Sequence, residues 1–243
     1  MVRQYTIDQV VALFLFPFII VILTVLYIVV IAFQGRPFIF GSERMRSPDQ
    51  AFNLLKIRTM HPVDATVDQS ALGGDQMWRV TPIGGLLRRT RLDELPQIFN
   101  VLRGDLNFVG PRPPLRKYVV QYPELYKQVL ADTRPGITGL ATVMVHAREE
   151  RLLSACETAA ETDDVYRKHC IPLKARLDLI YRDNRGWRLN TMILWMTFYR
   201  LLPSSLTLMA SGTPRRSVSV FRRGQSRVFG AGAGFRPRQV ENV

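Results

Sequence analysis

Residues 10–33 read VVALFLFPFIIVILTVLYIVVIAF, a run of 24 residues without a charged side chain. At about 1.5 Å per residue, a helix of this length reaches about 36 Å, which exceeds the roughly 30 Å hydrocarbon core of a bilayer. The run is too long for the apolar part of a signal peptide, and no small-residue cleavage site follows it. The sequence therefore predicts a membrane-inserted helix over residues 1–34.

Pro17 lies about one third of the way along this run. Proline lacks an amide hydrogen and tends to kink a helix. Two structures are consistent with it: a kinked helix that spans the bilayer, and a helix–break–helix hairpin that enters and leaves through one leaflet. Hydropathy alone favours the span. Arg36, Arg44 and Lys56 follow the run, and this positive charge predicts a cytoplasmic downstream domain.

The chain has 243 residues and a formal net charge of +13, from 33 Lys and Arg against 20 Asp and Glu. Such an excess suits nucleic acid, an anionic membrane or phosphorylated substrates as partners. The only cysteines are Cys156 and Cys170, which excludes a disulfide-stapled scaffold. Residues 207–243 are rich in Gly, Pro, Ser and Arg, and we expect a flexible basic tail there.

The intervening residues 35–206 are mixed in polarity. Apolar spacing predicts helices over 95–102 and 115–130, with Pro123 starting a second helix in the latter. Short strands are expected at 107–109 and 140–145. Residues 191–206 form an apolar, aromatic-bearing helix, suited either to a core or to the membrane interface. The predicted fold is helix-rich α/β with interfacial amphipathic helices.

The residues that carry chemistry gather between Lys56 and Arg112. Asp93 and Glu94 are adjacent carboxylates at the start of a predicted helix, where acids also serve simply to stabilise the helix dipole. Arg88 precedes the pair, and Arg112 follows it on a loop stiffened by two prolines, Pro111 and Pro113. Such a cluster forms a charge network, or neutralises a diphosphate while a carboxylate attacks it or binds Mg²⁺.

Residues 87–113 read LRRTRLDELPQIFNVLRGDLNFVGPRP. This run resembles the pattern LR-x-x-SLDELPQL-x-N-V-L-x-G-x-x-x-x-VGPRP of the bacterial monotopic polyprenyl-phosphate phosphoglycosyl transferases, the bacterial sugar transferase family. The resemblance extends from about residue 8 to residue 202. It includes GRPF at 35–38, KIRTM at 56–60, RPGITG at 134–139, and Asp178 and Tyr181 at the positions of a D-x-x-Y motif.

The resemblance implies that residues 35–206 are a catalytic domain that moves a sugar-1-phosphate from a UDP-sugar to polyprenyl (undecaprenyl) phosphate. UMP is released, and a surface glycan is initiated. Asp93 would form a covalent phosphosugar intermediate, assisted by Glu94, with Mg²⁺ as cofactor held by this pair. Lys56, Arg88 and Arg112 would bind substrate phosphates. Further donor-binding candidates implied by the resemblance are Arg134, Asp178 and Tyr181.

The resemblance also implies a place in the cell. It favours a re-entrant helix broken at Pro17, although Phe16 stands where the family often has serine. The domain would lie on the cytoplasmic face of the bacterial inner membrane and feed downstream glycosyltransferases of exopolysaccharide, capsule or lipopolysaccharide synthesis. It predicts no nucleic-acid partner and leaves a homo-oligomer open.

Two departures from the family pattern concern the donor. Leu140–His146 replaces the usual W-A-Q-V-N-G-R, and Asn190 stands where aspartate is common. The donor sugar therefore stays open. Two other functions are weighed against transfer: a catalytically altered membrane scaffold or regulator of glycan assembly, and a membrane-tethered nucleic-acid binder. The intact LDELPQ and GPRP segments argue against the scaffold, and the binder lacks a recognisable module.

Overall fold

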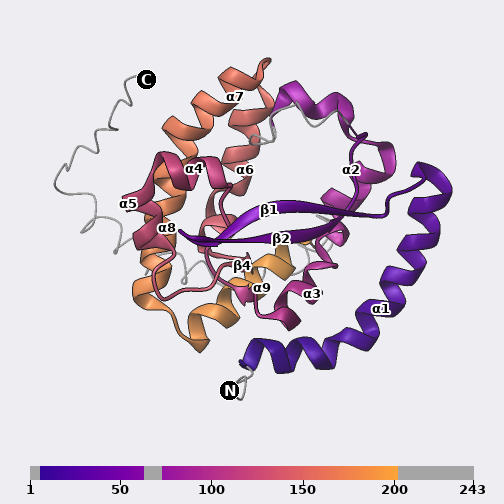
Figure 1. The fold of residues 1–243 in the computed structure, drawn as a ribbon, viewed down its shortest axis with the longest axis horizontal. Helices are drawn as coiled ribbons and strands as arrows, with labels where there is room; N and C mark the ends of the chain where they lie inside the picture. The colour runs from indigo at the N-terminus through magenta and orange to yellow at the C-terminus, as the bar shows by residue number, and fades with distance from the viewer. Residues whose placement is uncertain (1–5, 63–72, 202–243) are drawn as a thin grey trace, which may run out of the picture. The chain divides into compact units, whose positions relative to one another are not determined.

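The computed structural model describes residues 6–62 and 73–201 (Figure 1). Within these ranges the fold is helix-rich α/β with one long apolar helix at the N-terminal side, as the sequence predicts. The basic tail predicted over 207–243 lies outside the described residues, and so does the end of the predicted domain after residue 201.

The long helix α1 covers Ile7–Gln34 and is apolar and long enough to cross a membrane. Residues on both sides of Pro17 are helical, and the ribbon of α1 bends between its ends (Figure 1). A proline inside a helix removes one backbone hydrogen bond and is a common cause of such a bend. Most large side chains of α1 face outward; Phe14 and Phe18, for example, are 74% and 71% exposed.

A β-hairpin follows α1 and carries one of the predicted phosphate-binding residues. Strand β1 (Ile39–Ser47) pairs in antiparallel fashion with β2 (Gln50–Ile57), in a register that sets Phe40 opposite Lys56 and Arg44 opposite Phe52. Opposed residues of an antiparallel pair project to the same face. Lys56 and Arg44 therefore share one face of the hairpin.

The Asp-Glu pair lies in a short turn after the hairpin. The 3₁₀ segment η1 (Gly74–Arg79) leads into helix α2 (Pro82–Arg89), which is capped by Thr81 through a 2.9 Å bond from the Gly84 amide. The 3₁₀ turn η2 (Leu92–Glu94) then joins α2 to helix α3 (Gln97–Arg103), which confirms the helix predicted near 95–102. Helix α3 ends at Gly104, whose φ of 82° suits glycine.

Two glycine-containing turns press against each other beside the site. Strand β3 (Asn107–Val109), predicted from the sequence, pairs in parallel with β4 (Gly136–Thr138). The Gly110 amide donates to Thr138 O and the Gly136 amide to Pro111 O, each at 2.9 Å. A Cβ at position 136 would lie 2.1 Å from the Gly110 nitrogen, so only glycine fits this contact.

Helices make up the remainder of the described chain. The pair predicted over 115–130 is confirmed, with Pro123 opening the second helix. The apolar helix predicted over 191–206 is confirmed as far as residue 201. These elements are α4 (Arg116–Gln121), α5 (Pro123–Val129), α6 (Leu140–Ser154), α7 (Ala159–Val165), the π-helical turn η3 (Tyr166–Cys170), α8 (Ile171–Asn184) and α9 (Trp187–Leu201).

The strand predicted at 140–145 is wrong, because these residues form the first turns of α6. The Val143 amide already donates to Gly139 O at 3.0 Å, which is the spacing of an α-helix. The six residues LATVMV are apolar and partly β-branched, and so short a run does not distinguish a strand from a buried helix. The following residues, HAREERLL, are mostly good helix formers and extend the helix.

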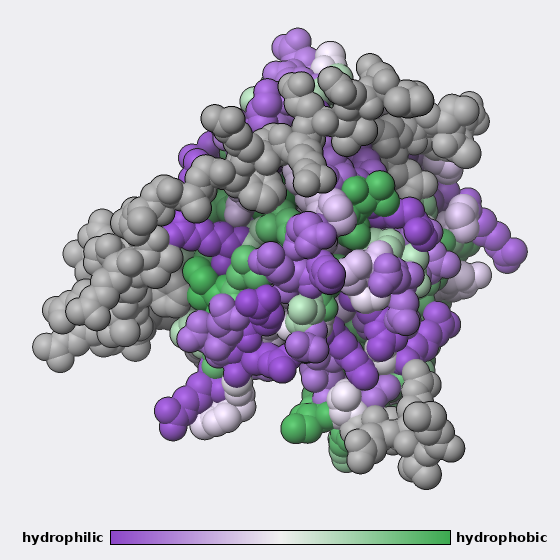
Figure 2. Space-filling model, turned by 60° about the vertical axis from the view of Figure 1, so that its left-hand side comes forward, coloured by the Kyte–Doolittle hydropathy of each residue, from purple (hydrophilic) through white to green (hydrophobic). Residues whose placement is uncertain are grey.

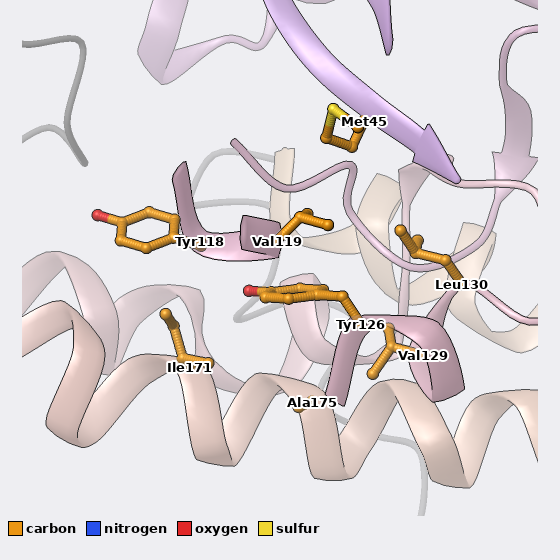
Figure 3. Close-up of a cluster of buried hydrophobic side chains, with 8 residues drawn as sticks. All are labelled: Met45, Tyr118, Val119, Tyr126, Val129, Leu130, Ile171 and Ala175. Carbon is orange, nitrogen blue, oxygen red and sulfur yellow. The ribbon is translucent and has the colours of Figure 1, made fainter. Parts of the chain in front are cut away.

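A buried cluster supports the hairpin from below. Figure 3 shows Met45 of β1 above the side chains of α4 and α5, with α8 on the opposite side of the cluster. The cluster contains Met45, Tyr118, Val119, Tyr126, Val129, Leu130, Ile171 and Ala175. Burial of these apolar groups fixes the hairpin relative to the C-terminal helices.

Helix α1 shares two further clusters with the rest of the described chain. Ala12 packs with Leu54 and Ile98, and Phe16 meets Phe99 edge to face at 5.5 Å. Farther along α1, Leu23 and Val30 pack with residues of β2 and α2, namely Ile57 and Leu87. Figure 2 brings forward the left-hand side of Figure 1, where most of the coloured surface is hydrophilic with smaller hydrophobic patches.

We expect Gly136→Ala to destabilise the protein by about 1–3 kcal/mol, because the added methyl group must displace the Gly110 backbone. The matched control is Gly186→Ala, whose Cβ would meet nothing within 4 Å. Thermal unfolding of the full chain in detergent measures both. Equal stability of the two variants would contradict the close packing of the two turns.

Candidate active site

Asp93 and Glu94 are buried in the η2 turn, at 6% and 9% exposure. Arg91, just before the turn, has a left-handed backbone with φ of 59°, which reverses the chain after α2. This reversal brings the two acids inward. Buried carboxylates require partners or a function, since removing a charge from water is costly.

Glu94 is the centre of an ion-pair cluster. Its Oε1 atom lies 3.3 Å from Lys56 Nζ, 3.3 Å from Arg91 Nη1 and 3.1 Å from Arg112 Nη2. Burial raises the pKa of Glu94, but the charges of Lys56, Arg112 and Arg91 outweigh burial and hold that pKa well below its ordinary range. Glu94 is therefore ionised at neutral pH and joins three segments of the chain.

Asp93 differs from its neighbour. Burial raises its pKa, and the nearby charge of Lys56 only partly offsets that effect. No residue within the described ranges donates a hydrogen bond to Asp93 Oδ1, which is buried. The surroundings of the two adjacent carboxylates therefore differ. The negative charge of Glu94 is balanced by three cations, whereas Asp93 Oδ1 has no partner among the described residues. Such divergence marks a candidate functional site.

The three predicted phosphate-binding cations surround this pair. Lys56 comes from β2, and burial lowers its pKa. Arg88 comes from the last turn of α2, donates from Nε to Thr59 Oγ1 at 2.7 Å, and acts electrostatically on Asp93. The charge of Glu94 raises the pKa of Arg112. The structure brings these residues together around the two acids, and their contact with phosphate stays a prediction.

Backbone hydrogen bonds hold the loop that carries Arg112. Pro111 accepts the Gly136 amide at 2.9 Å, and Pro114 O accepts the Met45 amide of β1 at 2.9 Å. Pro113 lies buried between these two anchors. Because both sides of Arg112 are fixed, its guanidinium reaches Glu94 at little entropic cost.

The ion pairs of Glu94 include none of the three donor-binding candidates. Tyr181 is buried, and its hydroxyl bonds Val109 O at 3.2 Å and Asn190 Oδ1 at 2.9 Å. Asp178 is buried one turn away on α8, and burial raises its pKa to about 7. Arg134 is half-buried, and its carbonyl oxygen packs against Gly110. Tyr181 and Asn190 thus support the strand that precedes the GPRP loop.

The structure adds two residues that the sequence analysis did not assign to the site. Arg91 pairs with Glu94 three residues later, a spacing that is readable from the sequence. Asn100 is fully buried and bridges α3 to β2: its Oδ1 accepts the Leu55 amide at 3.0 Å, and its Nδ2 donates to Asn53 O at 2.8 Å. An asparagine inside an apolar helix was the available signal.

The residues present fit Mg²⁺ in a limited way. The described residues hold no group of three or more His, Cys, Asp or Glu suited to a metal. Mg²⁺ commonly takes only one or two carboxylates and completes its shell with water and substrate phosphates. Asp93 Oδ1 provides such an oxygen, whereas Glu94 already faces three cations. The fit to Mg²⁺ therefore rests on Asp93 together with a phosphate substrate.

A buried carboxylate oxygen that lacks a partner in the described chain, with several cations held nearby, suits a site that handles phosphate groups. The comparison with known families agrees. A model described as "Bacterial sugar transferase" matches residues 1–204, and the chain belongs to that family.

Curated relatives carry related names. The chain is 33% identical over 172 residues to the UDP-N-acetylgalactosamine-undecaprenyl-phosphate N-acetylgalactosaminephosphotransferase of Aeromonas hydrophila, covering 68% of this chain and 36% of that protein. It is 41% identical over 111 residues to the UDP-glucose:undecaprenyl-phosphate glucose-1-phosphate transferase of Caulobacter vibrioides, covering 44% and 40%. It is 35% identical over 171 residues to the uncharacterized sugar transferase EpsL of Bacillus subtilis, covering 70% and 72%. The chain thus spans well under half of the first two relatives.

We expect Asp93→Asn and Glu94→Gln to change stability in opposite directions at pH 7. The folded state raises the pKa of Asp93, so its ionised form is unfavourable there, and the neutral amide stabilises the fold. This gain should vanish as the pH falls below 3.8, the ordinary pKa, because Asp93 is then protonated in both states.

Glu94→Gln should instead destabilise the protein by about 1–3 kcal/mol, because it leaves half-buried cations without their counter-charge. The pKa of Glu94 is depressed in the folded state, so this loss is complete above its ordinary value of 4.5 and shrinks as the pH falls below it. Unfolding curves across this pH range measure both variants. Shifts of the same sign at pH 7 would contradict the contrast between the two acids.

Proposed function

We propose that this chain is a phosphoglycosyl transferase that moves a sugar-1-phosphate from a UDP-sugar to polyprenyl phosphate, such as undecaprenyl phosphate. The observation that carries the proposal is the buried Asp93 Oδ1, which has no hydrogen-bond partner among the described residues, beside Glu94, whose charge is balanced by cations. Family membership supports it, and so do relatives named as undecaprenyl-phosphate sugar phosphotransferases.

In the proposed first step, an Asp93 carboxylate oxygen attacks the phosphorus that carries the sugar. The bond from that phosphorus to the bridging oxygen breaks, and UMP leaves with the electron pair. In the second step, an oxygen of polyprenyl phosphate attacks the same phosphorus of the aspartyl intermediate. Asp93 is released as a carboxylate, and the product is a polyprenyl-diphosphate sugar, which downstream glycosyltransferases would extend.

Electrostatics determines whether the first step is feasible. A carboxylate and a diphosphate repel each other, so the barrier falls only if fixed cations offset the charge. Lys56, Arg88 and Arg112 provide these cations, and Glu94 positions two of them through its ion pairs. Their geometry is set before substrate arrives, which avoids reorganisation during the reaction.

Mg²⁺, when bound, supplies further neutralisation of the diphosphate. Asp93 and the phosphates of the donor are the groups that would hold it. The desolvated surroundings of Asp93 strengthen every charge interaction made there.

We propose further that α1 is re-entrant. Both ends of the helix bond to the same folded body: Asp8 Oδ1 accepts the Phe108 amide at 3.0 Å, and Arg58 donates to the carbonyl oxygens of Gln34 and Gly35. A spanning helix would separate its ends by the thickness of a bilayer core, about 30 Å, and place them on opposite sides. These contacts support a bent helix that stays in one leaflet. We place the domain on the cytoplasmic face of the inner membrane because positively charged residues follow the apolar run.

Exposed aromatic residues support contact with the same membrane surface. Trp187 and Trp195 of α9 are 74% and 67% exposed, and Trp78 in η1 is 73% exposed. Tryptophan is favoured where lipid headgroups meet the hydrocarbon core. We propose that α9 lies in this interface, which would hold the site close to a lipid-borne acceptor.

We expect Asp93→Asn to abolish UMP release from UDP-sugar in the presence of Mg²⁺ and polyprenyl phosphate, because an amide is not a competent nucleophile here. Intact-mass spectrometry of the wild-type chain with donor alone should show an added sugar phosphate that the variant lacks. Asp49→Asn, at an exposed hairpin position, is the matched control and should keep both signals. Normal turnover of Asp93→Asn would exclude Asp93 as the nucleophile.

For topology, we expect tags at both ends of the chain to be protected from protease added outside intact spheroplasts, where it reaches only the periplasmic face of the inner membrane. They should become accessible after the membrane is opened. A spanning α1 would instead expose the N-terminal tag to periplasmic protease while the C-terminal tag stays protected. That pattern would overturn the re-entrant helix without affecting the proposed reaction.

A further inference from the structure

Arg44 is a charged residue of this region that the scheme above leaves unused. It is half-buried on β1, and its Nε atom is buried without a hydrogen-bond partner within the described part of the chain. The preceding residue differs: Glu43 forms a two-point ion pair with Arg116, at 2.7 and 3.1 Å. A guanidinium N–H that is withdrawn from water without an acceptor is costly, so the position of Arg44 Nε suggests that an acceptor outside the protein binds there.

The backbone places Arg44 beside the loop that carries Arg112. The Met45 amide donates to Pro114 O at 2.9 Å, and the Glu43–Arg116 ion pair joins the same two segments two positions away along each of them. Arg44 lies between these two links. It also shares a hairpin face with Lys56, as the strand register requires.

The charges around Arg44 are repulsive. Burial, together with the smaller effect of the positive charge of Arg112, lowers the pKa of Arg44 to about 10. Arg44 in turn lowers the pKa of Lys56. Glu94 is already shared by three other cations, so it does not offset this additional charge. The cluster therefore holds a surplus of positive charge at its Arg44 end, before any substrate binds.

The cluster has two ends with different neighbours. Arg88 acts on Asp93, whereas Arg44 acts on Arg112 and Lys56. Along the hairpin, Arg88 bonds Thr59 just past the end of β2, whereas the register sets Arg44 nearer the hairpin turn, with Lys56 between these two positions. Arg44 therefore lies on the far side of Lys56 from Arg88, a cation that acts on Asp93. In phosphoryl transfer the attacking and leaving oxygens lie roughly in line through phosphorus. The leaving group of an attack by Asp93 thus points away from it.

Resting on the proposed function, we infer that Arg44 binds the nucleotide phosphate of the donor, the one that departs with UMP. A half-buried guanidinium whose buried Nε has no partner in the described chain suits two-point contact with phosphate oxygens. The bound phosphate would supply the counter-charge that the protein lacks at this end. Arg44 would not contact the phosphorus that is transferred, so it would act on donor binding and UMP release and not on acceptor attack.

The test measures binding of UMP and of uridine to the full chain in lipid nanodiscs. Arg44→Gln should weaken UMP binding about ten- to a hundredfold and leave uridine binding unchanged, because only UMP carries the phosphate. Arg44→Lys should restore part of the affinity, since lysine keeps the positive charge but lacks the planar guanidinium that contacts two phosphate oxygens at once. Arg46→Gln, on the same strand, is the control and should bind both as the wild type does.

A second measurement separates the half-reactions. The covalent adduct is formed with donor, freed of nucleotide, and then treated with polyprenyl phosphate or with UMP. Arg44→Gln should slow only the reaction with UMP. Unchanged UMP affinity, equal loss of uridine affinity, or equal slowing of both reactions would overturn the inference.

The outcomes also distinguish this inference from the proposed function. If the wild-type chain releases UMP from a UDP-sugar but Arg44→Gln binds UMP as tightly as the wild type, only the assignment of Arg44 is overturned. A wild-type chain that neither binds UMP nor releases it from any UDP-sugar would overturn both.

Discussion

The ion-pair cluster around Glu94 is the interaction on which the site depends. One carboxylate oxygen meets Lys56 from the hairpin, Arg91 from its own turn and Arg112 from the GPRP loop. Lys56 and Arg112 are distant from Glu94 in sequence, and both are half-buried. Removing Glu94 would leave the positive charges of Lys56, Arg91 and Arg112 close together without a counter-charge. The same ion pairs therefore shape the site and offset the repulsion among its cations. Because Glu94 forms the ion pairs with these cations, Asp93 Oδ1 is left without a partner among the described residues.

A second constraint is steric and acts on the backbone. The GPRP and RPGITG segments meet so closely that glycine is needed at the contact, and the parallel strands β3 and β4 form directly beside it. Tyr181 adds a hydrogen bond to the carbonyl of Val109, at the start of the same loop. The loop that carries Arg112 is thus held from several sides. Rigidity of this kind favours electrostatic catalysis, which works best when charges are placed before the substrate arrives.

Much of this was predictable from local sequence patterns. The apolar run over 10–33 predicted α1, Pro123 marked the start of α5, and Gly104 marked the end of α3. The gathering of Lys56, Arg88 and Arg112 around the acids came through the family resemblance. Long-range contacts were not predictable: nothing near Asn100 in the sequence names Leu55 as its partner, and nothing near Arg44 names Arg112 as its neighbour. The strand expected at 140–145 failed because six residues do not distinguish the two periodicities.

The attachment of α1 at both ends has a consequence for the order of assembly. Helix α1 is synthesised early, yet its first turn bonds to Leu102 and Phe108, which leave the ribosome about a hundred residues later. Its last turn is bound by Arg58, which is made much sooner. The end of the helix is therefore secured before its beginning, and the beginning stays unanchored until α3 and β3 exist. The last contacts of α1 therefore form only when the domain folds. Insertion of α1 into the membrane and packing of the domain core are then completed together.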